Sequence, residues 1–187
     1  MGAENSLHCD KTGLPVCFVH PAAKEILMRF QWAAAIAFAV LFLFPSSGSA
    51  QVLTEHDVSS HMALTIAEAA IAECGAKVSV AIVDRAGRLR VFVQGDGAAP
   101  HNLELARRKA YTALTFGRTS AEWAQRTETQ LQGQRMLTDV IPLQGGVPIK
   151  IGDETIGGVG LSGAPMGGAQ EEACAKAGIA KVADQLK

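Results

Sequence analysis

The sequence predicts an α+β domain in which helices cover the faces of an antiparallel sheet. Two pairs of strand-like runs are each joined by a short turn that contains glycine, and hairpins of this kind pair antiparallel. Segments with helical periodicity precede, separate and follow the two hairpins. The predicted order of elements is therefore α, ββ, α, α, ββ, α, and each helix is expected to bury its apolar side against the sheet.

The segment at 28–50 is predicted to direct export rather than to join the fold. It begins with a basic residue, Arg29, continues with an apolar run at 32–44 that Pro45 interrupts, and ends in small residues at Ala50. This is the pattern of a secretory signal peptide cleaved after Ala50. An uncleaved membrane anchor is the alternative, although the apolar run is short for a membrane span.

The remaining chain divides on either side of this signal peptide. Residues 1–27 are too long, too mixed in charge and too aperiodic for the basic start of a signal peptide. We interpret them as a disordered upstream extension, with Met28 as the natural start. Residues 51–187 are then the folded domain, expected in the periplasm or secreted, with no stable membrane span after cleavage.

The folded domain is predicted to open with a helix and a hairpin. Residues 54–57 resemble a capping box, and the helix after them is expected to end at Gly75. Strands at 77–84 and 89–94 follow, because apolar residues alternate at period two in both runs. Gly87 supplies the positive φ that the tight turn between the strands requires.

The middle of the domain is predicted to be helical. A glycine-rich loop at 95–100 leads into a second helix that ends at Gly117. Thr119 or Ser120 can cap a short third helix that ends near Gln130. A loop is expected to connect this helix to the second hairpin.

The last third predicts the second hairpin and a final helix. The strand at 145–151 contains Pro148, which lacks a backbone N–H and therefore belongs at a sheet edge. The strand at 155–162 carries several glycines, which let another group approach the backbone closely. A helix from about 169 to 186 completes the sandwich.

Composition restricts the function of the protein. The 187 residues carry a formal net charge of −1 and only 5% aromatic residues, so neither a basic surface nor a stacking platform for nucleic acid is expected. No G-x-S-x-G, H-E-x-x-H, P-loop or C-x-x-C-H motif occurs. The sequence therefore carries no strong catalytic signature and no site for covalent haem, and it leaves open whether the protein is an enzyme.

Three side chains are candidate metal or cofactor ligands. His101, at the start of the second helix, is either a polar helix-end residue or a metal ligand or acid–base group that faces the glycine loop. His61 in the first helix is either solvent-facing or a ligand. Met166, in the loop after the glycine-rich strand, is either core filler or a soft axial ligand to iron.

Lysine and cysteine side chains leave further alternatives. Lys109 lies among small apolar residues, so its stem either runs along the sheet edge with the amine in water, or its charge serves a carboxylate or propionate. Cys74 and Cys174 are the cysteines that remain after cleavage. They are either a disulfide, which an oxidising compartment would permit, or two buried thiols.

The order of several motifs resembles the HbpS/GlcG-like haem-binding family. The motifs are VSVAIVDRAGRL at 78–89, GDGA at 95–98, ARRKAYTALTF at 106–116, GGVPIKIGDETIGGVGLSG at 145–163 and EEACAKAGI at 171–179. The resemblance implies a profilin-like α/β/α sandwich with a central five-stranded antiparallel sheet, and homo-oligomers. Two positions depart from the family pattern: Gln94 stands where an Arg is frequent, and Glu171-Glu172 where Asp-Glu is frequent.

The resemblance implies a secreted or periplasmic protein that binds haem non-covalently, with redox sensing or haem handling as its role. The flat cofactor would lie beside the bare glycine strand. Candidate ligands are His101, which is also the candidate metal ligand, then His61 and Met166; Lys109 or Arg118 would pair with a propionate.

The sequence also allows two other functions for this protein. The protein is alternatively a small-molecule enzyme or an accessory protein of hydroxy-acid metabolism of the glycolate type, with a pocket formed by the glycine strand and the loop of His101. A purely structural oligomer is the third alternative, with the glycines serving close packing.

Overall fold

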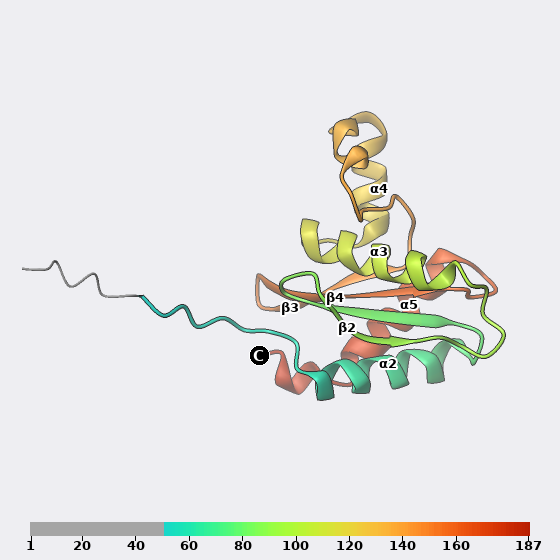
Figure 1. Ribbon diagram of the computed structural model, residues 1–187, viewed down its shortest axis with the longest axis horizontal. Helices are drawn as coiled ribbons and strands as arrows, with labels where there is room; N and C mark the ends of the chain where they lie inside the picture. The colour runs from blue at the N-terminus through green and yellow to red at the C-terminus, as the bar shows by residue number, and fades with distance from the viewer. Residues whose placement is uncertain (1–50) are drawn as a thin grey trace, which may run out of the picture. The chain divides into compact units, whose positions relative to one another are not determined.

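The computed structural model describes residues 51–187, so the predicted upstream extension at 1–27 and the signal peptide at 28–50 lie outside the described residues. The predicted order of helices and hairpins is confirmed, with two short 3₁₀ turns in addition (Figure 1). The elements are α2 (Ser60–Cys74), β1 (Ser79–Asp84), β2 (Leu89–Val93), α3 (Asn102–Phe116), α4 (Ser120–Thr129), η1 (Gln132–Met136), β3 (Gly146–Ile151), β4 (Glu154–Ser162), α5 (Gly168–Ala180) and η2 (Ala183–Gln185). None of the helices within 51–187 is long and apolar enough to span a membrane.

The sheet has four antiparallel strands in the order β2-β1-β4-β3. The expectation of five strands is wrong for the part of the chain that the structure describes. Each hairpin contributes two strands, and much of the chain between the hairpins is used in α3, α4 and η1. Strand β3 lies at an edge, as the missing N–H of Pro148 predicts.

Helices cover both faces of this sheet and make a three-layer sandwich. Helices α2 and α5 pack together on one face, and α3 lies on the other (Figure 1). The main hydrophobic cluster lies between the sheet and the α2–α5 pair, and it includes the inward residues of the two central strands: Val80, Ile82, Val159 and Leu161. The α+β prediction is confirmed by this arrangement.

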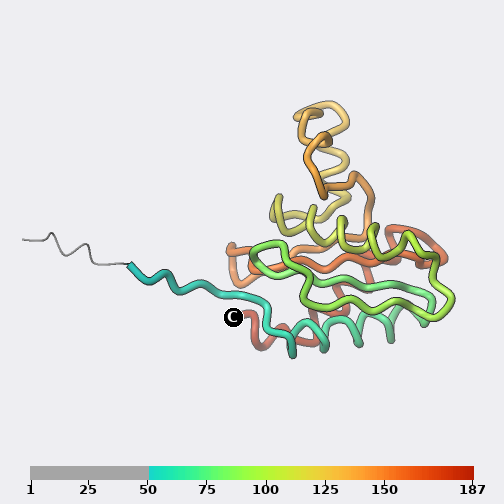
Figure 2. Tube along the Cα trace, viewed as in Figure 1, coloured from blue at the N-terminus to red at the C-terminus, as the bar shows by residue number. Residues whose placement is uncertain are grey.

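Helix α4 and the turn η1 lie on the far side of α3 from the sheet (Figure 2). A capping box at Thr119 and Glu122 starts α4, because each side chain bonds the other residue's backbone N–H. Trp123 of α4 is buried and stacks on Phe116 of α3, with ring centroids 4.9 Å apart. This stacking attaches the α4–η1 projection to the sandwich.

The first hairpin follows the predicted alternation except at its turn. Val93 lies opposite Val80 and Val91 opposite Ile82, as the period-two pattern requires. A register shift after Ile82 then places Leu89 opposite Val83, so Leu89 leaves the core face and is 44% exposed. The period-two alternation expected for the strand at 89–94 therefore holds at Val91 and Val93 but not at Leu89.

Helix α3 approaches the sheet at a face without side chains. Gly146 of β3 and Gly158 and Gly160 of β4 point toward this helix. A Cβ at any of the three would overlap a backbone carbonyl of α3; the carbonyls are those of Lys109, Ala110 and Ala106 respectively. The expectation that the glycine strand at 155–162 leaves space for a flat cofactor is therefore wrong, because the α3 backbone occupies the space at Gly158 and Gly160.

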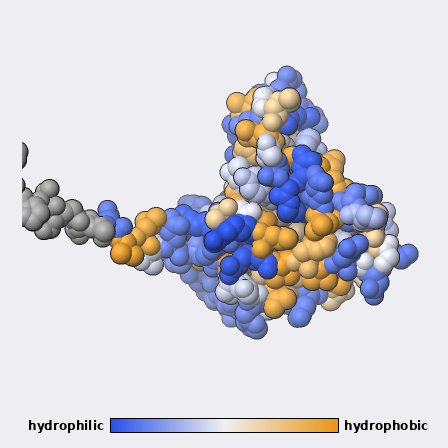
Figure 3. Space-filling model, viewed as in Figure 1, coloured by the Kyte–Doolittle hydropathy of each residue, from blue (hydrophilic) through white to orange (hydrophobic). Residues whose placement is uncertain are grey.

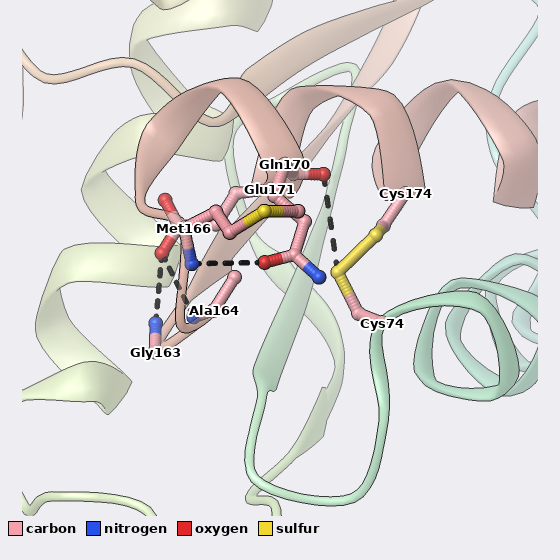
Figure 4. The surroundings of a disulfide bond; sticks show 7 residues. All are labelled: Cys74, Gly163, Ala164, Met166, Gln170, Glu171 and Cys174. Carbon is pink, nitrogen blue, oxygen red and sulfur yellow. Dashed lines mark hydrogen bonds between the residues drawn. A yellow bond between two sulfur atoms is a disulfide. The ribbon is translucent and has the colours of Figure 1, made fainter.

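A disulfide resolves the alternatives for the two cysteines. Cys74, the last residue of α2, is bonded to Cys174 in the middle of α5, with their Cα atoms 5.7 Å apart (Figure 4). The bond joins the two helices that share one face of the sheet. It closes a loop of about 100 residues that contains the whole sheet.

We expect Gly160→Ala to destabilise the protein by about 1–3 kcal/mol, because the new Cβ forces α3 away from the sheet. The matched control is Gly133→Ala, where a Cβ meets no atom within 4 Å. Urea unfolding of both variants measures the difference. Equal unfolding midpoints for the two variants would contradict the proposed close contact.

Candidate functional site

A buried ion pair joins the two sides of the sandwich at one end. Lys109 of α3 donates from Nζ to Oε2 of Glu171 on α5 at 2.6 Å, and the two side chains are each 5% exposed. The same Nζ donates to the carbonyl of Leu161 at 3.0 Å. The interpretation of Lys109 as a stem with its amine in water is therefore wrong.

The other oxygen of Glu171 holds the loop that follows β4. Oε1 accepts from the backbone N–H of Gly163 at 2.8 Å and of Ala164 at 3.3 Å (Figure 4). Burying a charged pair is costly unless its remaining hydrogen-bonding atoms also find partners. Here both side chains have several partners, so the ammonium of Lys109 is committed to protein groups from β4 and α5.

His101 and Met166 lie at the same end of the molecule as this pair. His101 is the exposed N-cap residue of α3, and its side chain makes no capping bond. Met166 lies in the β4–α5 loop and is 78% exposed. The two segments meet because Oγ of Ser162, at the end of β4, bonds Oδ1 of Asn102, at the start of α3, at 3.1 Å. The structure therefore places the start of α3 and the β4–α5 loop, which carry these two candidates, at the same end of the sheet.

His61 and Arg118 lie elsewhere. His61 is exposed in the first turn of α2, on the other face of the sheet from α3. Arg118 follows Gly117, the C-cap of α3, so the 15 residues of the helix separate it from His101 by about 22 Å. The five candidate residues therefore do not form one site within a single chain.

Arg118 lines a groove between the start of α4 and the edge strand β3. The groove has a volume of about 560 Å³ and is lined by Gly117, Arg118, Thr119, Glu122, Val147, Pro148 and Lys150. Sequence reasoning missed Lys150, since a single lysine in a strand gives no indication of which loop it will face. The chain reversal at Gly117, with φ of 61°, puts Arg118 beside β3.

A charged cluster near the turn between β3 and β4 was also missed by sequence reasoning. Oε2 of Glu154 lies 2.9 Å from Nδ1 of His56, and Arg85 donates to the other carboxylate oxygen. These hydrogen bonds, that of His56 first and then that of Arg85, lower the pKa of Glu154 from its ordinary value. The three residues come from separate segments, so no spacing in the sequence indicates the cluster.

Within residues 51–187 no group of three or more His, Cys, Asp or Glu side chains is placed to hold a metal ion. A haem iron is different, because the porphyrin supplies four of its ligands and the protein adds one or two axial groups. Exposed imidazole and thioether side chains such as His101 and Met166 are the donor types that fit such an iron.

Comparison with known proteins assigns the family. A family model described as "Haem degrading protein HbpS-like" matches residues 53–180. The chain belongs to the HbpS-like family. The resemblance found in the sequence is confirmed by this match. No protein with a curated description matches the chain.

Solved structures of HbpS and of other proteins share the fold. A double mutant of HbpS from Streptomyces reticuli is 32% identical, with a TM-score of 0.67, and the match covers 74% of this chain and 95% of that chain. The complex of PduOC with haem is 25% identical, with a TM-score of 0.55 and coverage of 66% and 93%. Protein ORFY of Klebsiella pneumoniae is 22% identical, with a TM-score of 0.63 and coverage of 72% and 96%, and it supports the fold alone.

We expect Lys109→Met to cost about 3–5 kcal/mol of stability, since it leaves the carboxylate of Glu171 buried without a cation. Adding Glu171→Gln to this variant removes the uncompensated charge and keeps an oxygen for the N–H groups of Gly163 and Ala164. The double variant should therefore be more stable than Lys109→Met alone. Chemical unfolding measures both; additive losses would contradict the coupling of the pair.

Proposed function

We propose that the protein binds haem non-covalently, with haem handling or redox sensing as its role. The observation that carries the proposal is the HbpS-like family match over residues 53–180. The related PduOC, which has been solved as a complex with haem, also supports it. Bound haem would supply an iron that changes oxidation state, and the protein would supply the axial ligand and the surface that receives the ring.

The end of the molecule that carries His101 and Met166 is our proposed haem surface. Both side chains are exposed, and neither imidazole nor thioether is used in a hydrogen bond among residues 51–187. Leu103, two residues from His101, is 44% exposed, and a porphyrin ring on this surface would cover its apolar side chain. The bare glycine strand is not part of this surface, because α3 fills it. His101 is the first candidate for the axial ligand, and Met166 is a second.

We expect the purified protein to bind hemin with a shifted Soret band and a stoichiometry near one haem per chain. His101→Ala should abolish the shift or change its position, because the ring would lose its nitrogen ligand. His61→Ala is the matched control, since it removes an equally exposed imidazole on the other face of the sheet. Met166→Leu tests the thioether.

Each arm of this titration has an outcome that counts against the proposal. A wild-type protein that leaves the hemin spectrum unchanged would overturn haem binding itself. A normal spectrum for His101→Ala, together with a lost shift for His61→Ala, would move the axial ligand to α2.

We also propose that copies of the chain associate through strand β2. This strand is an edge of the sheet, and hydrophobic side chains gather over it between α2 and α3 (Figure 3). Leu89 is 44% exposed, and Val91, Phe92 and Val93 are only half-buried. An unpaired apolar edge is a ready surface for another strand.

We expect size-exclusion chromatography with light scattering to give a mass of two or more chains. Leu89→Lys should shift the protein toward the monomer, because a lysine on an edge strand disfavours strand pairing. Lys77→Gln is a control that changes charge outside the strand. A monomeric wild-type protein would contradict the association, and an unchanged mass for Leu89→Lys would place it on another surface.

Export to the periplasm or the exterior is part of the proposal. The signal-peptide pattern at 28–50 supports it, and the Cys74–Cys174 disulfide suits an oxidising compartment. We expect the exported protein to begin at Gln51 when its N-terminus is sequenced. A protein that retains residues 28–50 would contradict cleavage.

The disulfide also predicts a stability difference. Reduction should lower the free energy of unfolding by about 4–5 kcal/mol, the chain-entropy value for a closed loop of 100 residues. Unfolding in urea with and without dithiothreitol measures this difference. The variant Cys74→Ala/Cys174→Ala is the control, since dithiothreitol should leave its unfolding unchanged.

A further inference from the structure

We propose that the groove at the start of α4 binds the carboxylate group of a small organic ligand, with Arg118 and Lys150 as its cationic partners. We call it the Arg118–Lys150 groove and define it by the seven residues that line its volume of about 560 Å³. It is separate from the surface of His101, which lies at the other end of α3. The proposal therefore does not depend on haem ligation by His101.

The two cations of the groove have no carboxylate partner in the part of the chain that the structure describes. Arg118 is half-buried, and its side chain makes one hydrogen bond, from Nε to the carbonyl of Phe116 at 3.3 Å. Lys150 is also half-buried, and it takes part in no ion pair or hydrogen bond through Nζ among residues 51–187. Two other cations of the domain do have carboxylate partners, because Arg107 pairs with Asp139 and Lys109 pairs with Glu171.

The backbone brings the two charges to one place. Gly117 ends α3 in the left-handed conformation, with φ of 61°, and the chain turns there toward β3. A Cβ on Gly117 would lie 4.0 Å from Nζ of Lys150, so the ammonium reaches the residue next to Arg118. A helix end and a strand edge, both ordered by the fold, therefore position the cations before any ligand arrives.

Glu122 also lines the groove, but its carboxylate is already engaged in the capping box at the start of α4. Its Oε2 accepts from the backbone N–H of Thr119 at 2.9 Å and from Oγ1 of Thr119 at 3.1 Å. Two cations against this one engaged carboxylate leave the groove with a net positive charge. The groove therefore favours an anion.

The lining identifies the class of ligand. A guanidinium fork matches the two oxygens of a carboxylate, and an ammonium adds a point charge. Val147 and Pro148 supply apolar area on the β3 side, which an inorganic anion would not use. The volume of the groove falls in the range of small-molecule sites. A carboxylate on an apolar carbon skeleton fits both features, and such a group is found in free organic acids and in the propionates of haem.

Benzoate and benzamide test the proposal, because they share a shape and differ in charge. In an NMR titration of the purified protein, benzoate should shift the backbone amides of Gly117, Thr119 and Val147, while benzamide should leave them unchanged. Equal shifts with the two probes, or no shift with benzoate at millimolar concentrations, would overturn the proposal.

Matched variants test which cations bind the carboxylate of benzoate. Arg118→Gln and Lys150→Gln should each weaken benzoate binding about tenfold, as expected for the loss of one charge-assisted hydrogen bond. Arg126→Gln is the control, because it removes an exposed cation of α4 that does not line the groove. Unchanged affinity in the Arg118→Gln/Lys150→Gln double variant, or an equal loss in Arg126→Gln, would refute the assignment.

Hemin distinguishes the two sources of the carboxylate. If the groove receives a haem propionate, the iron lies too far from His101 of the same chain for ligation. The double variant should then bind hemin more weakly than the wild type, His101→Ala should bind it normally, and hemin should compete with benzoate. If the groove receives a free organic acid, hemin binding should be unchanged in the double variant. Failure of hemin binding in the wild-type protein would refute the haem proposal and leave the benzoate result as an independent test of the groove.

Discussion

The contact between the α3 backbone and the glycine face of β3 and β4 is the constraint on which the rest of the sandwich depends. Gly146, Gly158 and Gly160 offer no side chains, so the helix lies directly on the sheet. Such a contact leaves no room for a ligand between these layers. The two surfaces proposed to bind ligands consequently lie at the ends of α3: one beside the loop after β4, and the other in the groove against β3.

The two ends of α3 have different chemistry. The start of the helix carries the exposed imidazole of His101 and lies beside the loop of Met166. Glu171, which is paired with Lys109, holds this loop through hydrogen bonds to its backbone. The end of the helix carries Arg118, opposite Lys150 on β3. One end therefore offers soft and nitrogen donors for a metal, and the other offers positive charge for an anion.

The sequence predicts the order of elements and the edge position of Pro148, because these follow from local periodicity and from the chemistry of proline. It does not predict the partner of Lys109, since Glu171 is 62 residues away and no spacing relates them. The glycines were misinterpreted for a similar reason. A missing side chain permits close approach, but the sequence does not say whether a ligand or a helix makes that approach.

Strand order has a consequence for how the chain reaches its native state. The two central strands, β1 and β4, are distant in the sequence. They pair from Ser79 opposite Ser162 to Asp84 opposite Gly157, so this ladder forms only when distant parts of the chain meet. Local hairpins can form early, whereas their docking has to close a long loop and is expected to be the slow event. A chain whose synthesis stops before β4 would expose the unpaired apolar edge of β1. Rapid synthesis of the C-terminal third would therefore protect the chain from aggregation through this edge.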